Sequence, residues 1–190
     1  MIEWKQSMIL YHGSYCSVNR PDLSKCGAMK DFGQGFYLTT SLEQARNFVH
    51  SAVKKAEVLS LVPRGTTQGV VTEYRFSLSD GLKIKEYPDA DAEWLHCIAA
   101  HRKGNVFAEL KQELAPYDII AGKIANDQTN ATLTAYLAQL FGQIGTYEAD
   151  EICIRRLLPE RLENQICLRT QRALEVLEYI GEETVWTGKR

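Results

Sequence analysis

The sequence lacks several features that mark whole classes of protein. Its 190 residues contain no internal repeat, no low-complexity tract, and no apolar stretch long enough for a signal peptide or a membrane span. The formal net charge is only −2 and the pI is about 6.1, so no overall basic field favours nucleic-acid binding. We therefore expect a cytoplasmic protein, or one exported without a classical signal peptide, and no membrane partner.

The cysteine pattern indicates neither a disulfide framework nor a metal site. The number of cysteines is odd, and they form no C-x-x-C pair and no zinc-like spacing with histidine. They are Cys16, Cys26, Cys97, Cys153 and Cys167. We expect reduced thiols. His96 and His101 are five residues apart, which suits joint ligation on a helix poorly, so we interpret them as helix-surface residues and predict no metal.

Periodicity predicts an α+β domain. The chain is 45% hydrophobic and 24% charged, which fits one domain over residues 1–190. Strands are expected at 8–12, 70–78, 82–87, 117–121 and 165–169, and helices at 89–102, 129–141 and 148–157, with a helix or turn at 170–179 followed by a tail. These elements interleave without a regular βαβ rhythm, which favours antiparallel strands.

Two helices have clear boundary signals. Thr40-Ser41-Leu42-Glu43 reads as a capping box with Thr40 as the N-cap, opening a helix that runs to about Val58. In the segment 129–141, apolar residues recur at helical spacing from Leu133 to Phe141, and Gly142 is expected to stop the helix.

The most informative stretch lies between residues 9 and 45. An apolar strand runs into His12-Gly13-Ser14, and Gly33 and Gly35 then precede a strand that contains Tyr37. A histidine at a strand end can bond a ribose hydroxyl, glycine lets backbone approach a flat ligand, and a phenol ring can stack on an aromatic ligand. Either half alone is more typical of an ordinary strand end, a glycine hairpin and core aromatic residues than of a ligand site. Their combination in this order favours a site for NAD.

These motifs resemble the bacterial DUF3990-type proteins of the ADP-ribosyltransferase superfamily, specifically the diphtheria-toxin and poly-ADP-ribose polymerase branch with its His-Tyr-Glu triad. The resemblance covers most of the chain. It rests on the blocks 10–14, 30–39, 117–127 and 164–168, of which the first two are specific. It implies a split antiparallel β-sheet core with flanking helices.

The resemblance also implies roles for individual residues. His12 would bond the adenosine ribose 2′-hydroxyl, the Gly13 backbone would hold the nicotinamide carboxamide, and Tyr37 would stack on the nicotinamide ring. Phe48 would add a second stacking aromatic; otherwise it belongs to a core face with Ala45 and Ala52. Ser14 would bond the carboxamide or cap a turn.

The third motif departs from the family pattern, because Gln165 stands where the glutamate is expected. A carboxylate there would accept from the ribose 2″-hydroxyl and stabilise the positive charge that grows as nicotinamide leaves. An amide accepts as well but is neutral, and its alternative role is that of a surface strand residue. Glu163 has the same strand parity and is the fallback acid. From the sequence, Gln165→Glu is expected to retain or raise NAD cleavage.

Three further polar residues are candidates for the pocket edge. Asp31 lies in the second block, and Asn126 and Asp127 close the third. Each of them would line the pocket or cap a loop.

The function expected from this resemblance is NAD-dependent mono-ADP-ribosyl transfer, with NAD as substrate and a protein or nucleic acid as acceptor. Because the charged glutamate is missing, single transfer is expected rather than polymer formation. A close variant is an NAD glycohydrolase, and the other class is a non-catalytic module that binds NAD, ADP-ribose or a protein. An NAD-consuming domain of this size suggests a toxin or effector with a neutralising, antitoxin-like partner.

Overall fold

Two β-sheets form the centre of the molecule. The computed structural model describes residues 2–124, 127–158 and 162–188. The first sheet is antiparallel with the order β1-β3-β7, and the second has the order β2-β6-β5-β4. The strands of the first are β1 (Ser7–Ser14), β3 (Gln68–Ser77) and β7 (Leu177–Trp186); those of the second are β2 (Phe36–Leu38), β4 (Ile84–Glu86), β5 (Ile119–Lys123) and β6 (Asn164–Leu168).

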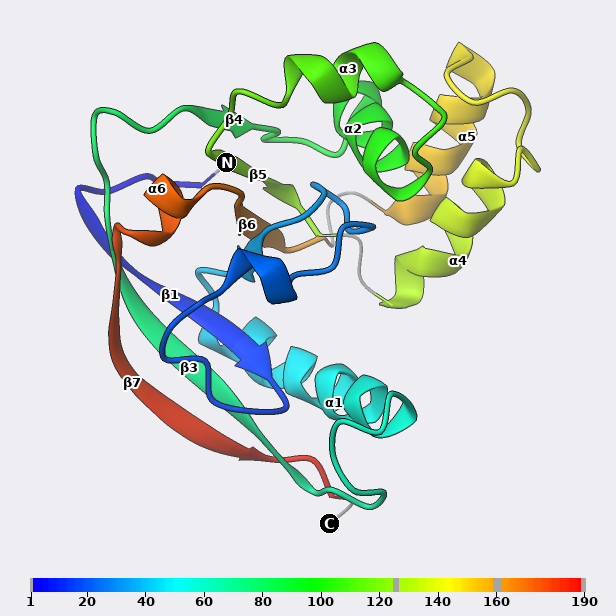
Figure 1. The fold of residues 1–190 in the computed structure, drawn as a ribbon. Helices are drawn as coiled ribbons and strands as arrows, with labels where there is room; N and C mark the ends of the chain where they lie inside the picture. Colours follow the sequence, from blue (N-terminus) through cyan, green and yellow to red (C-terminus); the bar gives the residue numbers. More distant parts are fainter. Residues whose placement is uncertain (1, 125–126, 159–161, 189–190) are drawn as a thin grey trace.

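The helices divide between the two sheets (Figure 1). Helix α1 packs on the first sheet, and α2 to α5 gather beside the second. Their bounds are α1 (Leu42–Val58), α2 (Ala92–Arg102), α3 (Ala108–Glu113), α4 (Asp127–Leu137), α5 (Tyr147–Leu157) and α6 (Gln171–Leu174), with a 3₁₀ turn η1 at Leu23–Lys25. Within the described residues, no helix is both long and apolar enough to cross a membrane.

The two sheets meet where β1 crosses the outer edge of β2. The amide of Tyr11 donates to the Thr39 carbonyl over 2.8 Å, and the amide of Thr39 donates back over 3.0 Å. We call this junction, together with the neighbouring start of β6, the seam. It brings the first two sequence blocks into contact, through Tyr11 and Thr39.

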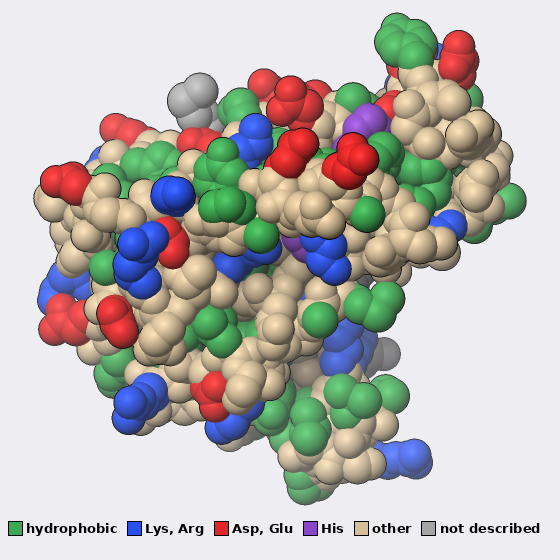
Figure 2. Space-filling model, turned by 45° about the horizontal axis from the view of Figure 1, so that its top comes forward, with side chains coloured by type: hydrophobic (Ala, Val, Ile, Leu, Met, Phe, Trp, Pro, Cys, Tyr) green, Lys and Arg blue, Asp and Glu red, His purple; other side chains and the backbone are tan. Residues whose placement is uncertain are grey.

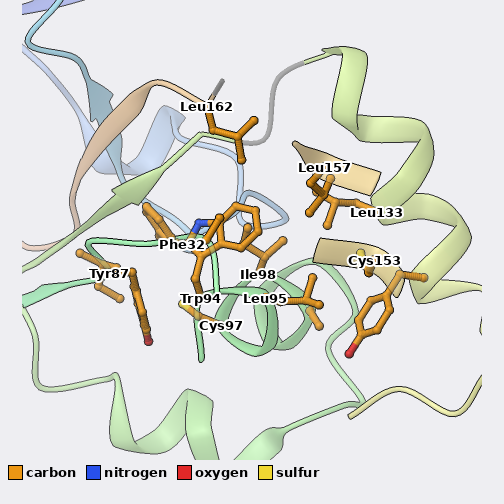
Figure 3. Packing of buried hydrophobic residues seen from close by; sticks show 14 of the residues in the cluster. Phe32, Tyr87, Trp94, Leu95, Cys97, Ile98, Leu133, Cys153, Leu157 and Leu162 are labelled. Carbon is orange, nitrogen blue, oxygen red and sulfur yellow. The ribbon is translucent and has the colours of Figure 1, made fainter. Parts of the chain in front are cut away.

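The second sheet separates two hydrophobic clusters. On one face, Phe36, Leu38, Ile166 and Leu168 pack toward β1 and β3. The other face is covered by α2, α4 and α5, whose buried side chains form one cluster that also includes Phe32 (Figure 3). Because neighbouring residues of a strand point to opposite faces, β6 contributes to both clusters, with Cys167 in the second one.

Most predicted elements are confirmed, with local corrections. The α+β class is correct, but β4 and β5 pair in parallel, so the strands are not all antiparallel. Helix α1 ends at Val58 as expected, whereas its N-cap is Ser41, whose hydroxyl accepts from the amide of Gln44, and not Thr40. Thr72, Tyr74 and Phe76 of β3 are all buried.

The C-terminal segment differs most from the prediction. Only Gln171–Leu174 is helical, and the ten-residue strand β7 replaces both the end of the predicted helix or turn at 170–179 and part of the expected tail. Helix α4 ends at Leu137, before the predicted Phe141, because Gln139 takes a left-handed conformation with φ of 63°. Leu140 therefore leaves the helical face and is 74% exposed. Helix α3 was not predicted, and its six residues are too short for a periodic signal.

The two histidines of α2 are not simple surface residues. His101 is buried, and its Nδ1 donates to the Cys97 carbonyl over 2.8 Å. His96 bonds Asp150 of α5 over 2.5 Å and stacks on Phe107. The interpretation as a helix-surface residue is therefore wrong for His101, whereas His96 remains partly exposed, with 25% of its side chain accessible. All five cysteines are free thiols, as expected.

Candidate functional site

His12 lies in the seam and contacts the Tyr37 strand directly. Its Nδ1 is 2.8 Å from the carbonyl oxygen of Tyr37, and its ring lies 4.4 Å from that of Phe36. Burial lowers the pKa of His12, and the bond to the Tyr37 carbonyl opposes this only in part. The imidazole is therefore neutral at pH 7. Since a carbonyl only accepts, Nδ1 carries the proton, and Nε2 is left as an acceptor for a ligand hydroxyl.

Tyr37 is held by the loop that precedes it. Its hydroxyl accepts from the amide of Phe32 over 3.0 Å and donates to the Gly33 carbonyl over 2.8 Å. Burial raises the pKa of Tyr37 well above its usual value, so the phenol stays protonated. Both hydroxyl bonds fix the plane of the ring before any ligand arrives.

Gln165 lies on the same face of the second sheet as Tyr37. Tyr37 is directly opposite Cys167, and Gln165 is two residues from Cys167 along β6. Gln165 is only 5% exposed, so the alternative of a surface strand residue is wrong. Its Nε2 donates to Oδ2 of Asp31 over 2.9 Å and to the Lys123 carbonyl over 3.3 Å.

Asp31 joins the second and third sequence blocks. Besides the bond from Gln165, its Oδ1 accepts from Nε of Arg102 over 2.7 Å and from Nη2 over 2.5 Å. Arg102 also donates to the side chain of Asn130 over 2.9 Å. Asp31 is 6% exposed, so this ion pair is largely shielded from water.

The glycines of the motifs have a packing explanation in addition to the proposed ligand contact. A Cβ at Gly13 would lie 2.3 Å from the Ala45 carbonyl oxygen of α1. At Gly35 a Cβ would lie 2.4 Å from Sγ of Cys167, and at Gly33, where φ is +81°, it would meet the ring of His101 at 2.6 Å. These positions therefore require glycine whether or not a ligand binds.

The remaining predicted residues are less closely joined. Ser14 is buried at the end of β1, opposite Val70. Phe48 is 42% exposed and lies outside the buried face of α1, which excludes the alternative of a core residue. Asn126 lies outside the described residues, and so does the side chain of Asp127, the first residue of α4.

Glu163, the fallback acid, is exposed and lies just before β6. Its pKa is raised, first by burial and then by Glu43. Reasoning from the sequence missed Arg102 and the Lys123 carbonyl, which complete the surroundings of Gln165. Arg102 is the last residue of α2, where a basic side chain is expected without any ligand, so no sequence signal marked it.

One side of the molecule is hollowed (Figure 2). Figure 2 shows a notch between the part of the molecule that carries α2 to α5 and the part that carries α1, with hydrophobic and basic side chains on its walls. Two open depressions lie elsewhere, one of about 510 Å³ beside Ser77–Asp80 and one of about 400 Å³ beside Phe107–Leu110. Among the described residues, no group of three or more His, Cys, Asp or Glu side chains is placed to hold a metal ion.

Comparison with known proteins identifies one family. The model of the family described as "Protein of unknown function (DUF3990)" matches residues 8–179, which includes β1, the seam, β6 and the start of β7. No curated protein matches the chain. Since the matched segment makes up most of the sequence, the chain belongs to the DUF3990 family.

Proposed function

We propose that this protein is an NAD-dependent mono-ADP-ribosyltransferase with the split-sheet fold of that superfamily, and that NAD binds at the seam. One observation carries the proposal. His12, Tyr37 and Gln165 come from three separate parts of the chain, and the bond of His12 to Tyr37 and the pairing of β2 with β6 bring them together. The resemblance assigned the same three residues to one site.

The chemical states of these groups support the same function. A neutral His12 with Nε2 as acceptor suits a ribose hydroxyl, which can donate. Tyr37 offers a ring whose hydroxyl is already bonded, so that it can stack without losing a polar contact. Gln165 is an uncharged hydrogen-bonding group at the position where the nicotinamide ribose would lie.

The reaction would break the bond between C1″ of the ribose and the pyridinium nitrogen. The electron pair of that bond goes to nicotinamide, which leaves neutral, and positive charge grows on the ribose. An acceptor nucleophile then attacks C1″ and loses a proton. A charged glutamate would stabilise this transition state, and its replacement by an amide is expected to cost on the order of 10²–10³ in rate.

Gln165 also favours a second candidate, a module that binds NAD or ADP-ribose without cleaving it. The amide keeps the hydrogen bond but lacks the charge, which is what a binder requires. A toxin or effector role with a neutralising partner, in the cytoplasm or after export, belongs to the first candidate.

The test uses NAD labelled in the adenylate phosphate, incubated with the purified protein in the presence and absence of cell lysate. Free nicotinamide together with labelled protein or nucleic acid supports the transferase. Nicotinamide with free ADP-ribose means an NAD glycohydrolase. NAD binding in calorimetry without nicotinamide release means the non-catalytic module, and neither binding nor release would contradict every form of the proposal.

A further inference from the structure

The side-chain amide of Gln165 lies between two groups that only accept hydrogen bonds. Its Nε2 faces the Asp31 carboxylate at 2.9 Å and the Lys123 carbonyl at 3.3 Å. An ionised carboxylate and a backbone carbonyl have no hydrogen to donate. The amide is therefore held in one of its two flipped orientations, with nitrogen toward Asp31 and Oε1 on the opposite side of the amide group.

The Asp31 carboxylate is itself held in place. Arg102 contacts Oδ1 through both Nε and Nη2, and it is tied to α4 through Asn130. Arg102 thus occupies one carboxylate oxygen, and the other faces Gln165. Held in this way by the Arg102 guanidinium, the carboxylate is a fixed acceptor.

We propose that Asp31 is a positioning residue that orients the Gln165 amide, so that its oxygen rather than its NH₂ group faces the nicotinamide ribose of NAD. The inference rests on the proposed function, in which Gln165 accepts from the ribose 2″-hydroxyl. The orientation also sets the sign of the electrostatic effect. The oxygen end of the amide dipole is negative and stabilises a growing positive charge, whereas a flipped amide would oppose it.

The same contact explains why an amide suits position 165. A glutamate there would place its carboxylate against the Asp31 carboxylate and the Lys123 carbonyl, and like charges at this distance are strongly unfavourable. The structure therefore reverses the expectation from the sequence. With Asp31 in place, Gln165→Glu should lower activity and not raise it.

A double-mutant cycle tests the inference. In Asp31→Asn, Arg102 retains the oxygen and the new NH₂ group faces Gln165, whose amide then flips. In Gln165→Glu, two carboxylates face each other. In the double variant, the asparagine NH₂ donates to the glutamate, so an orienting bond is restored. We expect each single variant to lose nicotinamide release roughly tenfold or more, and the double variant to regain most of it.

Controls separate positioning from folding. Asp80→Asn removes the charge of an exposed aspartate outside the candidate site. This control variant should release nicotinamide at the wild-type rate. Thermal melting is measured for every variant. If Asp31 were needed only for the fold, the double variant would release nicotinamide no faster than the slower single variant. That result would overturn the inference. If Asp31→Asn does not fold, Gln165→Glu still decides, because wild-type or higher activity in that variant would overturn it too.

The wild-type protein distinguishes failure of the inference from failure of the proposed function. If wild type binds NAD but releases no nicotinamide, NAD affinity is measured for the same variants. Each single variant should then bind NAD more weakly than wild type, and the double variant should regain most of the affinity. If wild type neither binds nor cleaves NAD, the proposed function is wrong and the positioning role falls with it.

Discussion

Two buried aspartates lie at opposite ends of the second sheet, and each is paired with an arginine. Asp118 precedes β5 and accepts from Arg172, from the Thr170 hydroxyl and from the amide of Lys83. Asp31 lies at the other end, beside Gln165 and the carbonyl of Lys123. Asp118 binds groups of α6 and of the segments that precede α6 and β4, and Asp31 binds a side chain of the candidate site.

Under the proposed function, this difference distinguishes a carboxylate that holds the fold together from one that orients a residue of the candidate site. Three of the bonds to Asp118 come from groups that connect β4, β5 and α6, so its contacts hold the sheet end together. Asp31 instead fixes the orientation of one amide whose oxygen is directed elsewhere. We therefore expect changes at Asp118 to alter stability and changes at the Asp31 end to alter NAD chemistry.

The largest expected effect is on stability at the Asp118 end. Asp118→Ala removes the acceptor of several hydrogen bonds from charged and backbone donors. This should lower the free energy of unfolding by about 2–3 kcal/mol. The loss is smaller than for a fully buried ion pair because Arg172 remains in contact with water. Urea denaturation measures this change. The NAD affinity of the folded variant should equal that of wild type. A clear loss of affinity would contradict the conclusion that Asp118 acts only on stability.

The acid stability of the protein should depend on the same residue. Burial raises the pKa of Asp118, but the bonds from Arg172, Lys83 and Thr170 outweigh it and lower the pKa from 3.8 to about 2. A lowered pKa stabilises the fold above pH 3.8, and this contribution is lost as the pH falls toward 2. Melting curves of wild type and Asp118→Asn should therefore converge between pH 4 and pH 2; a constant difference across that range would contradict the assignment.

At the Asp31 end, Tyr37 should affect ligand binding. Tyr37→Ala removes a stacking ring worth roughly 0.5–1.5 kcal/mol, so NAD affinity in calorimetry should fall about twofold to tenfold. Tyr37→Phe keeps the ring and removes only the bonds to Phe32 and Gly33, so it is the matched control and should bind more tightly than the alanine variant. Equal affinity in wild type and Tyr37→Ala would exclude Tyr37 from the site.

Part of the fold could be predicted because some elements carry local capping or periodicity signals. Helix α1 was predicted to run to about Val58, where it ends, because its start carries a capping signal, although the N-cap is Ser41 and not Thr40. Strand β7 was missed because its pattern does not alternate around Ile180 and Gly181. There the pairing register with β3 shifts between Glu73 and Tyr74, a tertiary feature with no local signal.

The candidate site could be predicted only in part. His12 and Tyr37 stand in compact motifs that can be recognised locally. The bonds of Asp31 to Arg102 and to Gln165 span 71 and 134 residues of sequence, so only the folded chain reveals them. The clashes that require Gly13 and Gly35 are likewise contacts with distant elements, α1 and β6.

The central claim, that NAD is cleaved at the seam, is tested most directly by the rate of nicotinamide release from NAD in wild type, His12→Ala and His50→Ala. His50 is an exposed histidine of α1 and serves as the control. We predict release by wild type and His50→Ala, and a loss of about tenfold or more in His12→Ala, because a ligand hydroxyl is left unpaired. No release by wild type, or an unchanged rate in a folded His12→Ala variant, would contradict the claim.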